Sequence, residues 1–390
     1  MRLNPRLVCL FVLALWPQPA QAQQSTRDVL GFLLTNRSIP TDDFERDARA
    51  TAQTRDAISV FLANELGRLP ITSGAGGFTY RLNPALGVME RSSDSFGPFY
   101  VERSLTTGSR HASLSVVFES TSFKNIDGRS LRDGTLVSTA SQLRGETVPF
   151  DVETLTLQLK TSTVAVLGTF GITDRLDVGV AAPFVNVSLN GQRYDTYRGQ
   201  TTLQASATSS SSGLGDMAIR AKYNFLRRQG VGLSAGAEAR LPTGRSDDLL
   251  GAGSASVQPR LIVSVENSRT GAHFVVGPVF GGSANELDYA AGLTVTGSAR
   301  LTLVTEIMGR HVSLGGLTDT TEPHPSLALV DTIRLSSVSR DTNRVLAVVG
   351  VKWNVAGTWL VDAHAQRSLT SAGLNAGWSP SVTLDYSFGR

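Results

Sequence analysis

Cysteine is almost absent from this chain. Its one cysteine, Cys9, lies inside the first apolar run, with seven apolar residues after it, so a lipoprotein box is not expected. Residues 1–22 have the parts of a Sec-type signal peptide, with a basic start, an apolar stretch from Leu7 to Trp16 and the small-x-small cleavage site Ala20-Gln21-Ala22. Cleavage there leaves 368 residues (390 − 22) without cysteine. Disulfides, thiolate metal sites and cysteine nucleophiles are therefore excluded.

An excess of either charge is also missing. The formal net charge of +3 becomes +1 (3 − 2) without the leader residues Arg2 and Arg6. Such a balance, with no run of lysine and arginine, excludes nucleic acid as a partner. After the leader no stretch of 18 or more apolar residues remains, so we expect no transmembrane helix.

Recognisable catalytic and metal motifs are lacking as well. The five histidines show no ligand spacing with carboxylates, and HExxH is absent, so we expect no metal and no cofactor. No Gly-x-Ser-x-Gly elbow occurs, so we expect no catalytic residues and no enzyme. An outer-membrane hydrolase is a remote alternative. The Ser/Thr-rich runs Thr208–Ser212 and Thr318–Thr321 have the composition of flexible loops.

What the chain does contain is strict alternation. From Asp216 to Phe225, apolar residues alternate with charged or polar ones, and this gives a strand one apolar and one polar face. The pattern recurs along the C-terminal two-thirds in runs of about ten residues, the length of a tilted strand that crosses a bilayer. Abundant glycine, at 38 residues, and a mean hydropathy of −0.02 are also typical of an outer-membrane barrel.

The alternating runs number twelve, which predicts an all-β fold consisting of a closed antiparallel transmembrane barrel over residues 111–390. They are His111–Thr121, Glu153–Phe170, Arg175–Leu189, Gly213–Phe225, Gly230–Leu241, Ser254–Glu266, Ala272–Phe280, Glu286–Thr296, Ala299–Arg310, Arg344–Val355, Thr358–Gln366 and Pro380–Phe388. Fourteen strands are the alternative if Phe78–Leu82 and Phe99–Leu105 join the wall. Short and long connections alternate, as expected for periplasmic turns and outer loops, and a soluble β-sandwich has no reason to show this parity.

The phase of the alternation predicts which side chains face the lumen. Both charge signs occur on the polar face, so we expect a mixed ion-pair lattice and not a ring of one sign. The predicted pore-lining residues are Asp216, Arg220, Lys222, Glu238, Arg240, Arg260, Glu306, Arg310, Lys352, Asp362 and His364. Across the turn near Arg227, we expect Asp216 to lie opposite Arg240, and Arg220 near Glu238. Outward positions include Leu261, Trp353 and Trp359, and the two tryptophans flank one short turn.

Residues 23–110 differ from the barrel pattern. A helix is predicted from Asp42, as its cap, to Leu66, followed by a glycine-rich bend at 71–80. We interpret this region as a plug in the lumen or a periplasmic segment. Its apolar residues need a surface to bury against, and the predicted plug residues are Phe61, Leu62, Leu66, Phe78, Phe96 and Phe99.

One set of motifs resembles a known family. Gly213-Leu214-Gly215-Asp216 with its following strand, then Leu241-Pro242-Thr243-Gly244 and Gly251-Ala252-Gly253, is similar to the signature of the outer-membrane channels grouped as the MetA-pathway phenol-degradation family. That family in turn resembles the FadL-type channels for hydrophobic compounds. The resemblance covers residues from about 150 to 390 and implies a barrel in the bacterial outer membrane with an N-terminal hatch.

The function expected from the resemblance is passive uptake of small hydrophobic or aromatic compounds. The alternatives are a general porin for polar solutes and a structural or adhesive barrel with working outer loops. The partners expected are outer-membrane lipid and lipopolysaccharide, a small hydrophobic solute and the barrel-assembly machinery. For the last of these, the C-terminal Tyr386-x-Phe388 is in phase, although Gly389 and Arg390 follow it.

Overall fold

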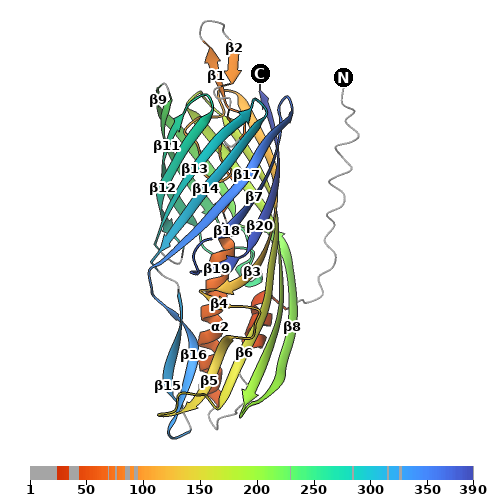
Figure 1. The fold of residues 1–390 in the computed structure, drawn as a ribbon, viewed down its shortest axis with the longest axis vertical. Helices are drawn as coiled ribbons and strands as arrows, with labels where there is room; N and C mark the ends of the chain where they lie inside the picture. The colour runs from red at the N-terminus through yellow and green to blue at the C-terminus, as the bar shows by residue number, and fades with distance from the viewer. Residues whose placement is uncertain are drawn as a thin grey trace, which may run out of the picture.

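The wall of the molecule is a closed antiparallel barrel, to which the described residues contribute twelve strands (Figure 1). The computed structural model describes residues 24–34, 44–68, 70–74, 77–83, 88–91, 95–228, 230–282, 285–313, 316–324 and 327–389. The wall strands are β3 (His111–Ile126), β6 (Asp151–Gly171), β7 (Leu176–Tyr197), β9 (Met217–Arg228), β10 (Val231–Leu241), β11 (Ser256–Glu266), β12 (Thr270–Gly281), β13 (Glu286–Ser298), β14 (Leu301–Val312), β17 (Thr342–Ala356), β18 (Trp359–Ser368) and β20 (Trp378–Gly389). Each falls on one of the twelve alternating runs, and the prediction of twelve strands is confirmed.

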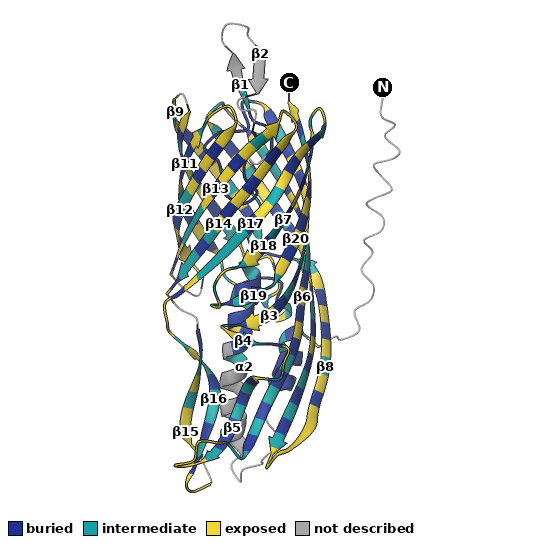
Figure 2. Cartoon of the chain, viewed as in Figure 1, coloured by how far each residue is buried: buried dark blue, intermediate teal, exposed yellow. Residues whose placement is uncertain are grey.

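Exposed and buried residues alternate along the wall strands (Figure 2). The exposed residues are mostly apolar and the buried ones mostly polar. In β9, Ile219 and Tyr223 are about half exposed, while Lys222 and Asn224 are buried. The outer face therefore suits lipid, and the inner face is polar. At the short turn after β17, Trp353 and Trp359 point outward with 52% and 41% exposure, as expected of an interfacial anchor.

The fourteen-strand alternative is wrong. Tyr80–Asn83 forms β1, which pairs only with β2 (Val88–Arg91) in a separate hairpin beyond the short-turn end of the barrel. Residues 99–105 form no strand. Strand β20 pairs directly with β3 from Gly389↔His111 to Ser381↔Glu119, which closes the barrel and leaves no edge for another strand to join.

Beyond the long-loop end, the wall continues as an extension on one side of the barrel. Strands β6 and β7 have 21 and 22 residues, about twice what crosses a bilayer. Near Pro183, β7 changes partner from Ala181↔Ala218 of β9 to Phe184↔Leu214 of β8. The remaining strands, at the lower end of the barrel and in the extension, are β4 (Arg129–Ser130), β5 (Leu136–Leu143), β8 (Gln200–Leu214), β15 (Gly316–Pro323), β16 (Val330–Val338) and β19 (Leu374–Ala376).

Two predicted loops are strands in the extension. Thr208–Ser212 belongs to β8 and Thr318–Thr321 to β15, so their interpretation as flexible loops was wrong. The physical reason is pairing: the backbone of β8 forms a ladder with β7 from Phe184↔Leu214 to Tyr197↔Gln200. Ladder hydrogen bonds and helix contacts outweigh the weak strand preference of serine.

Helices α1 (Thr26–Leu34) and α2 (Phe44–Gly67) pack inside the extension (Figure 1). Leu30 and Leu33 of α1 and Leu62 of α2 share a core with Leu155 and Leu189 of the wall strands. The predicted helix therefore exists from Phe44 onward, whereas Asp42, its expected cap, and the signal peptide 1–22 lie outside the described residues. No helix within the described ranges combines the length and apolar content needed to cross a membrane.

Candidate functional site

Part of the N-terminal segment (residues 24–110) occupies the lumen, namely the described residues 70–74, 77–79 and 95–107. From α2 the chain enters the barrel at Pro70, reaches the β1–β2 hairpin at the short-turn end and returns through Phe96–Thr107 to the start of β3 (Figure 1). We call residues 96–107 the strap. The lumen is therefore filled by chain along its length, and the structure places the segment inside the barrel and its extension.

The six predicted plug residues are all buried, in three places. Phe61, Leu62 and Leu66 join the core of the extension. At the short-turn end, Phe78 and Phe96 pack edge to face against each other, with ring centroids 5.3 Å apart, and against Leu360 of the wall. Midway between, Phe99 packs with Tyr100, Val304 and Val348.

No strand in the described part of the chain pairs with the strap. Ser73 and Tyr80 donate backbone hydrogen bonds to Phe99 and Thr107, and wall side chains bind other backbone groups of the strap. The Glu306 carboxylate accepts hydrogen bonds from the backbone N–H groups of Phe99, Tyr100 (3.0 Å) and Val101 (3.0 Å). Each buried backbone group left without a partner would cost about 1–3 kcal/mol. Glu306 thus replaces the neighbouring strand that an extended segment normally requires.

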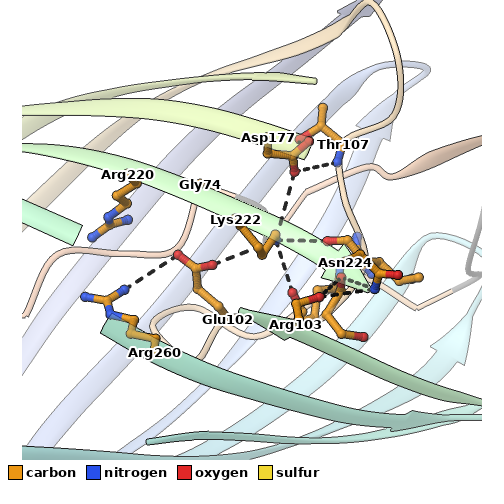
Figure 3. Close-up of polar contacts among 12 residues, drawn as sticks. Gly74, Glu102, Arg103, Thr107, Asp177, Arg220, Lys222, Asn224 and Arg260 are labelled. Atoms are coloured by element: carbon orange, nitrogen blue, oxygen red, sulfur yellow. Dashed lines mark hydrogen bonds and ion pairs between the residues drawn. The ribbon is translucent and has the colours of Figure 1, made fainter. Parts of the chain in front are cut away.

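Lys222 fastens the other half of the strap (Figure 3). Its ammonium donates to the carbonyl oxygens of Arg103 (3.1 Å) and Leu105 (2.9 Å). It also lies 3.8 Å from Glu102 and 4.0 Å from Asp177, whose carboxylate accepts the Thr107 N–H at 2.8 Å. The Lys222 ammonium therefore holds the strap in place. In an open channel the same ammonium would face water.

Lys352, Asp362 and His364 hold the strap near its first residues. Lys352 donates to the Pro98 carbonyl oxygen at 3.1 Å and lies 3.7 Å from Asp362. The His364 ring stacks on Phe99, with centroids 4.2 Å apart, and its Nε2 lies 3.0 Å from the Tyr100 hydroxyl. Side chains of β17 and β18 thus bind the same strap that Glu306 of β14 binds.

A cluster of arginines surrounds one buried carboxylate at the middle of the lumen. Glu238 accepts Arg220 (2.7 Å) and Arg240 (2.9 Å), and Arg260 lies 2.6 Å from it. Arg220 also donates to the carbonyl oxygens of Thr72 (2.7 Å) and Ile71 (3.2 Å). The cluster joins three neighbouring strands to the segment that follows α2.

A second ionic cluster lies where α2 ends. Glu65 accepts Arg310 at 2.7 Å and pairs with Arg344, and its second oxygen accepts the Leu374 N–H at 3.0 Å. Arg68 lies 2.5 Å from Glu286. Helix α2 is therefore attached to the wall by charge at its end and by apolar packing along its length.

Between these clusters lies a cavity of about 220 Å³. One side is the N-terminal segment, through Pro70, Ile71 and Val101, and the other is the wall from β9 to β17. Among the described residues its charged lining comprises both ionic clusters: Glu65, Arg68, Glu102, Arg220, Glu238, Arg240, Arg260, Glu286, Asp288, Arg310 and Arg344. Its apolar lining includes Phe123, Val275, Val279, Ala290, Met308, Leu346 and Leu374.

The glycine-rich signature forms a loop clamp, and its Asp216 also lines a small cavity beside Pro70 and Ile71 of the N-terminal segment. Asp216 accepts the backbone N–H groups of Gly244 (3.0 Å) and Ala252 (2.7 Å) in the loop between β10 and β11. Thr243 donates to the Gly215 carbonyl oxygen at 2.6 Å. A side chain at Gly251 would overlap Asp216, so glycine is required for the approach.

The predicted register between β9 and β10 is partly confirmed. Arg220 pairs directly with Glu238, as expected. The expected Asp216–Arg240 pair was wrong, because Arg240 lies opposite Ala218 and β9 begins only at Met217. Asp216 lies outside the strand, where its carboxylate meets the loop backbone described above.

Several site residues were missed from the sequence. Glu286 and Asp288 follow the polar phase of β13, which was a usable signal. Glu65, Arg68, Tyr100 and Glu102 lie in the segment outside the barrel pattern, so no alternation marked them. Their role depends on contacts with wall residues more than a hundred positions away.

A closed barrel with a lipid-compatible outside and a charged, occupied inside is an outer-membrane channel protein of the porin-like type. The chain belongs to the family described as "Putative MetA-pathway of phenol degradation", whose model matches residues 138–382. Its place is the bacterial outer membrane. No curated protein sequence matches the chain.

Solved outer-membrane barrels are similar to this chain at low identity. The COG4313 outer membrane channel from Pseudomonas putida F1 matches at 13% identity and a TM-score of 0.47, over 73% of this chain and 98% of that one. The KdgM porin matches at 9% and 0.37, over 70% and 99%. A Pseudomonas aeruginosa FadL homologue matches at 10% and 0.30, over 72% and 89%.

Proposed function

We propose that this protein passively admits small hydrophobic or aromatic compounds, with the N-terminal segment restricting the lumen. The observation that carries the proposal is the cavity between that segment and the wall. A water-filled pore offers an apolar solute no affinity, whereas a partly apolar cavity binds it weakly and releases it.

The size of the cavity suits a small solute. A dry cavity of about 150 Å³ holds benzene, and drug-sized ligands occupy about 300–1,000 Å³. The cavity here, about 220 Å³, lies between the two. Compounds with one aromatic ring are therefore the class it fits best.

In this proposal the solute leaves the first cavity through a second, smaller cavity of about 60 Å³. It lies behind Pro183 and Val185 of β7, on another side of the segment at Pro70 and Ile71. Proline donates no ladder hydrogen bond, and Pro183 lies where β7 exchanges one partner strand for another. Movement of the segment at Ile71 would join the two cavities.

Two adjacent alanines of β13 provide a matched test. Ala290 lines the cavity, and Ala291 is exposed on the outer face. Ala290→Phe should reduce toluene or phenol uptake into proteoliposomes several-fold, and Ala291→Phe should leave it unchanged. Equal uptake by wild type and Ala290→Phe would contradict transport through this cavity.

Planar-bilayer recording separates the proposal from a general polar porin. With the lumen occupied, the intact protein should show little steady current in salt solution. A large, constant open-pore current from the intact protein would instead favour the polar porin.

A further inference from the structure

We propose that the preferred solutes are aromatic carboxylates, with the ring on one wall of the cavity and the carboxylate at Arg220, Arg240 and Arg260. This inference rests on the proposed function and narrows its substrate class. It follows from how charge and apolar surface are distributed around the cavity.

The apolar wall is one continuous row. Val275 of β12 pairs with Ala290 of β13, Ala290 pairs with Met308 of β14, and Met308 pairs with Leu346 of β17. All four line the cavity. Directly paired residues are adjacent on one face of the sheet, so the four side chains form a continuous apolar strip against which an aromatic ring can pack.

The polar wall carries a surplus of positive charge. Arg220, Arg240 and Arg260 line it, and a fourth cation, Lys222, shares Glu102 with Arg260 but lies outside the cavity lining. Among the described residues, three carboxylates lie within 4.0 Å of them: Glu238, shared by the three arginines, Glu102, shared by Arg260 and Lys222, and Asp177 beside Lys222. The group therefore has four positive and three negative charges.

Asp288 lies between the two ionic clusters, near Arg310 on one side and Arg240 and Arg260 on the other. Asp288, Arg310 and Arg344 form one paired row across β13, β14 and β17. With Arg68, Glu65 and Glu286 these residues make three cations and three carboxylates along the cavity. With Glu102, Glu238 and the arginine trio (Arg220, Arg240 and Arg260), the cavity lining as a whole has six cations and five carboxylates among the described residues. The trio lies at the end of the apolar row nearest β11.

A carboxylate complements this arrangement better than a neutral group does. The planar guanidinium presents paired N–H donors that match the two oxygens of a carboxylate. Excess charge inside a closed wall is costly, and an incoming anion offsets it. The side chains of Arg220, Arg240 and Arg260 are 11%, 18% and 15% exposed, so Arg240, which also donates to the Gly67 carbonyl oxygen at 3.4 Å, is the most exposed of the three.

Benzoate and its neutral isostere benzamide test the inference on the full-length protein in detergent. Wild type should bind benzoate at least tenfold more tightly than benzamide by calorimetry. Arg240→Gln should remove this preference without weakening benzamide, and Arg240→Lys should retain part of it. Arg144→Gln, in the extension and away from the cavity, is the matched control and should bind as wild type.

Each outcome is decisive once heat-modifiable gel mobility shows that the variants are folded. Equal binding of benzoate and benzamide by wild type would overturn the carboxylate preference while leaving the proposed function in place. An undiminished preference in Arg240→Gln would overturn the assignment to the arginine trio. Failure of wild type to bind either compound, together with no toluene or phenol uptake, would overturn the proposed function itself.

Discussion

At the scale of single residues, most lumen charges bind the chain's own N-terminal segment. Glu306, Lys222 and Lys352 each contact backbone groups of the strap. In an open pore the same residues would be hydrated and would set ion selectivity. Here they supply hydrogen bonds that the strap lacks, so polarity inside the barrel is a structural requirement as well as a transport property.

The outer face gives the first residue-scale prediction. Leu261 is 46% exposed near the middle of β11, where lipid tails surround it. Leu261→Arg should therefore destabilise the barrel by about 2–4 kcal/mol. Val231→Arg, outward at the short-turn end of β10, is the control and should cost about 0–1 kcal/mol. Urea unfolding in lipid vesicles measures both, and equal losses would contradict the assigned depth.

The loop clamp at Asp216 gives the second residue-scale prediction. At Gly251 a methyl group would overlap the Asp216 carboxylate that holds the loop, and overpacking of this kind costs about 1–3 kcal/mol. Gly168 has open space around its Cβ position, so Gly168→Ala serves as the control and should change little. Gly251→Ala should therefore unfold at a lower urea concentration than wild type. If Gly251→Ala and Gly168→Ala unfold at the same urea concentration, the clamp contributes nothing to stability.

At the scale of elements, the wall was predictable because each strand repeats a two-residue pattern locally. The segment in the lumen was not, because its partners are remote in sequence. Glu306 lies 207 positions from Phe99, and no local periodicity connects them. Strand β8 was missed for a related reason, since its serines lie opposite β7 and beneath α1, with Thr26 bonded to Ser209 at 2.9 Å.

Removal of the N-terminal segment is the prediction at this scale. Deletion of residues 23–110 should leave a barrel that conducts polar ions strongly, because nothing then fills the lumen. It should also abolish saturable uptake of the aromatic solute, since the side of the cavity that the segment forms is lost. Single-channel recording and proteoliposome uptake measure the two effects, with gel mobility of the folded barrel as the control. Unchanged conductance and uptake would show that the segment neither blocks the lumen nor forms the solute site.

At the scale of the whole molecule, the two ends of the barrel face different compartments. The long-loop end with its extension should lie outside the cell, and the short turns in the periplasm. Val148 is 70% exposed in the extension, and Arg300 lies in the short turn between β13 and β14. On intact cells an impermeant maleimide should label Val148→Cys and not Arg300→Cys. The opposite pattern would invert the orientation.

The pairing of β3 with β20 also constrains the order of assembly. These are the first and last wall strands of the chain, so the ring has an open seam until synthesis reaches residue 389. The N-terminal segment is made first and ends up encircled by everything made after it. It reaches that position by lying against the inner face while the seam is open, or by being threaded through a finished ring. We expect the first route, because Glu306 and Lys352 can then bind the strap before the ring closes, and the wall is completed around a segment that is already in place.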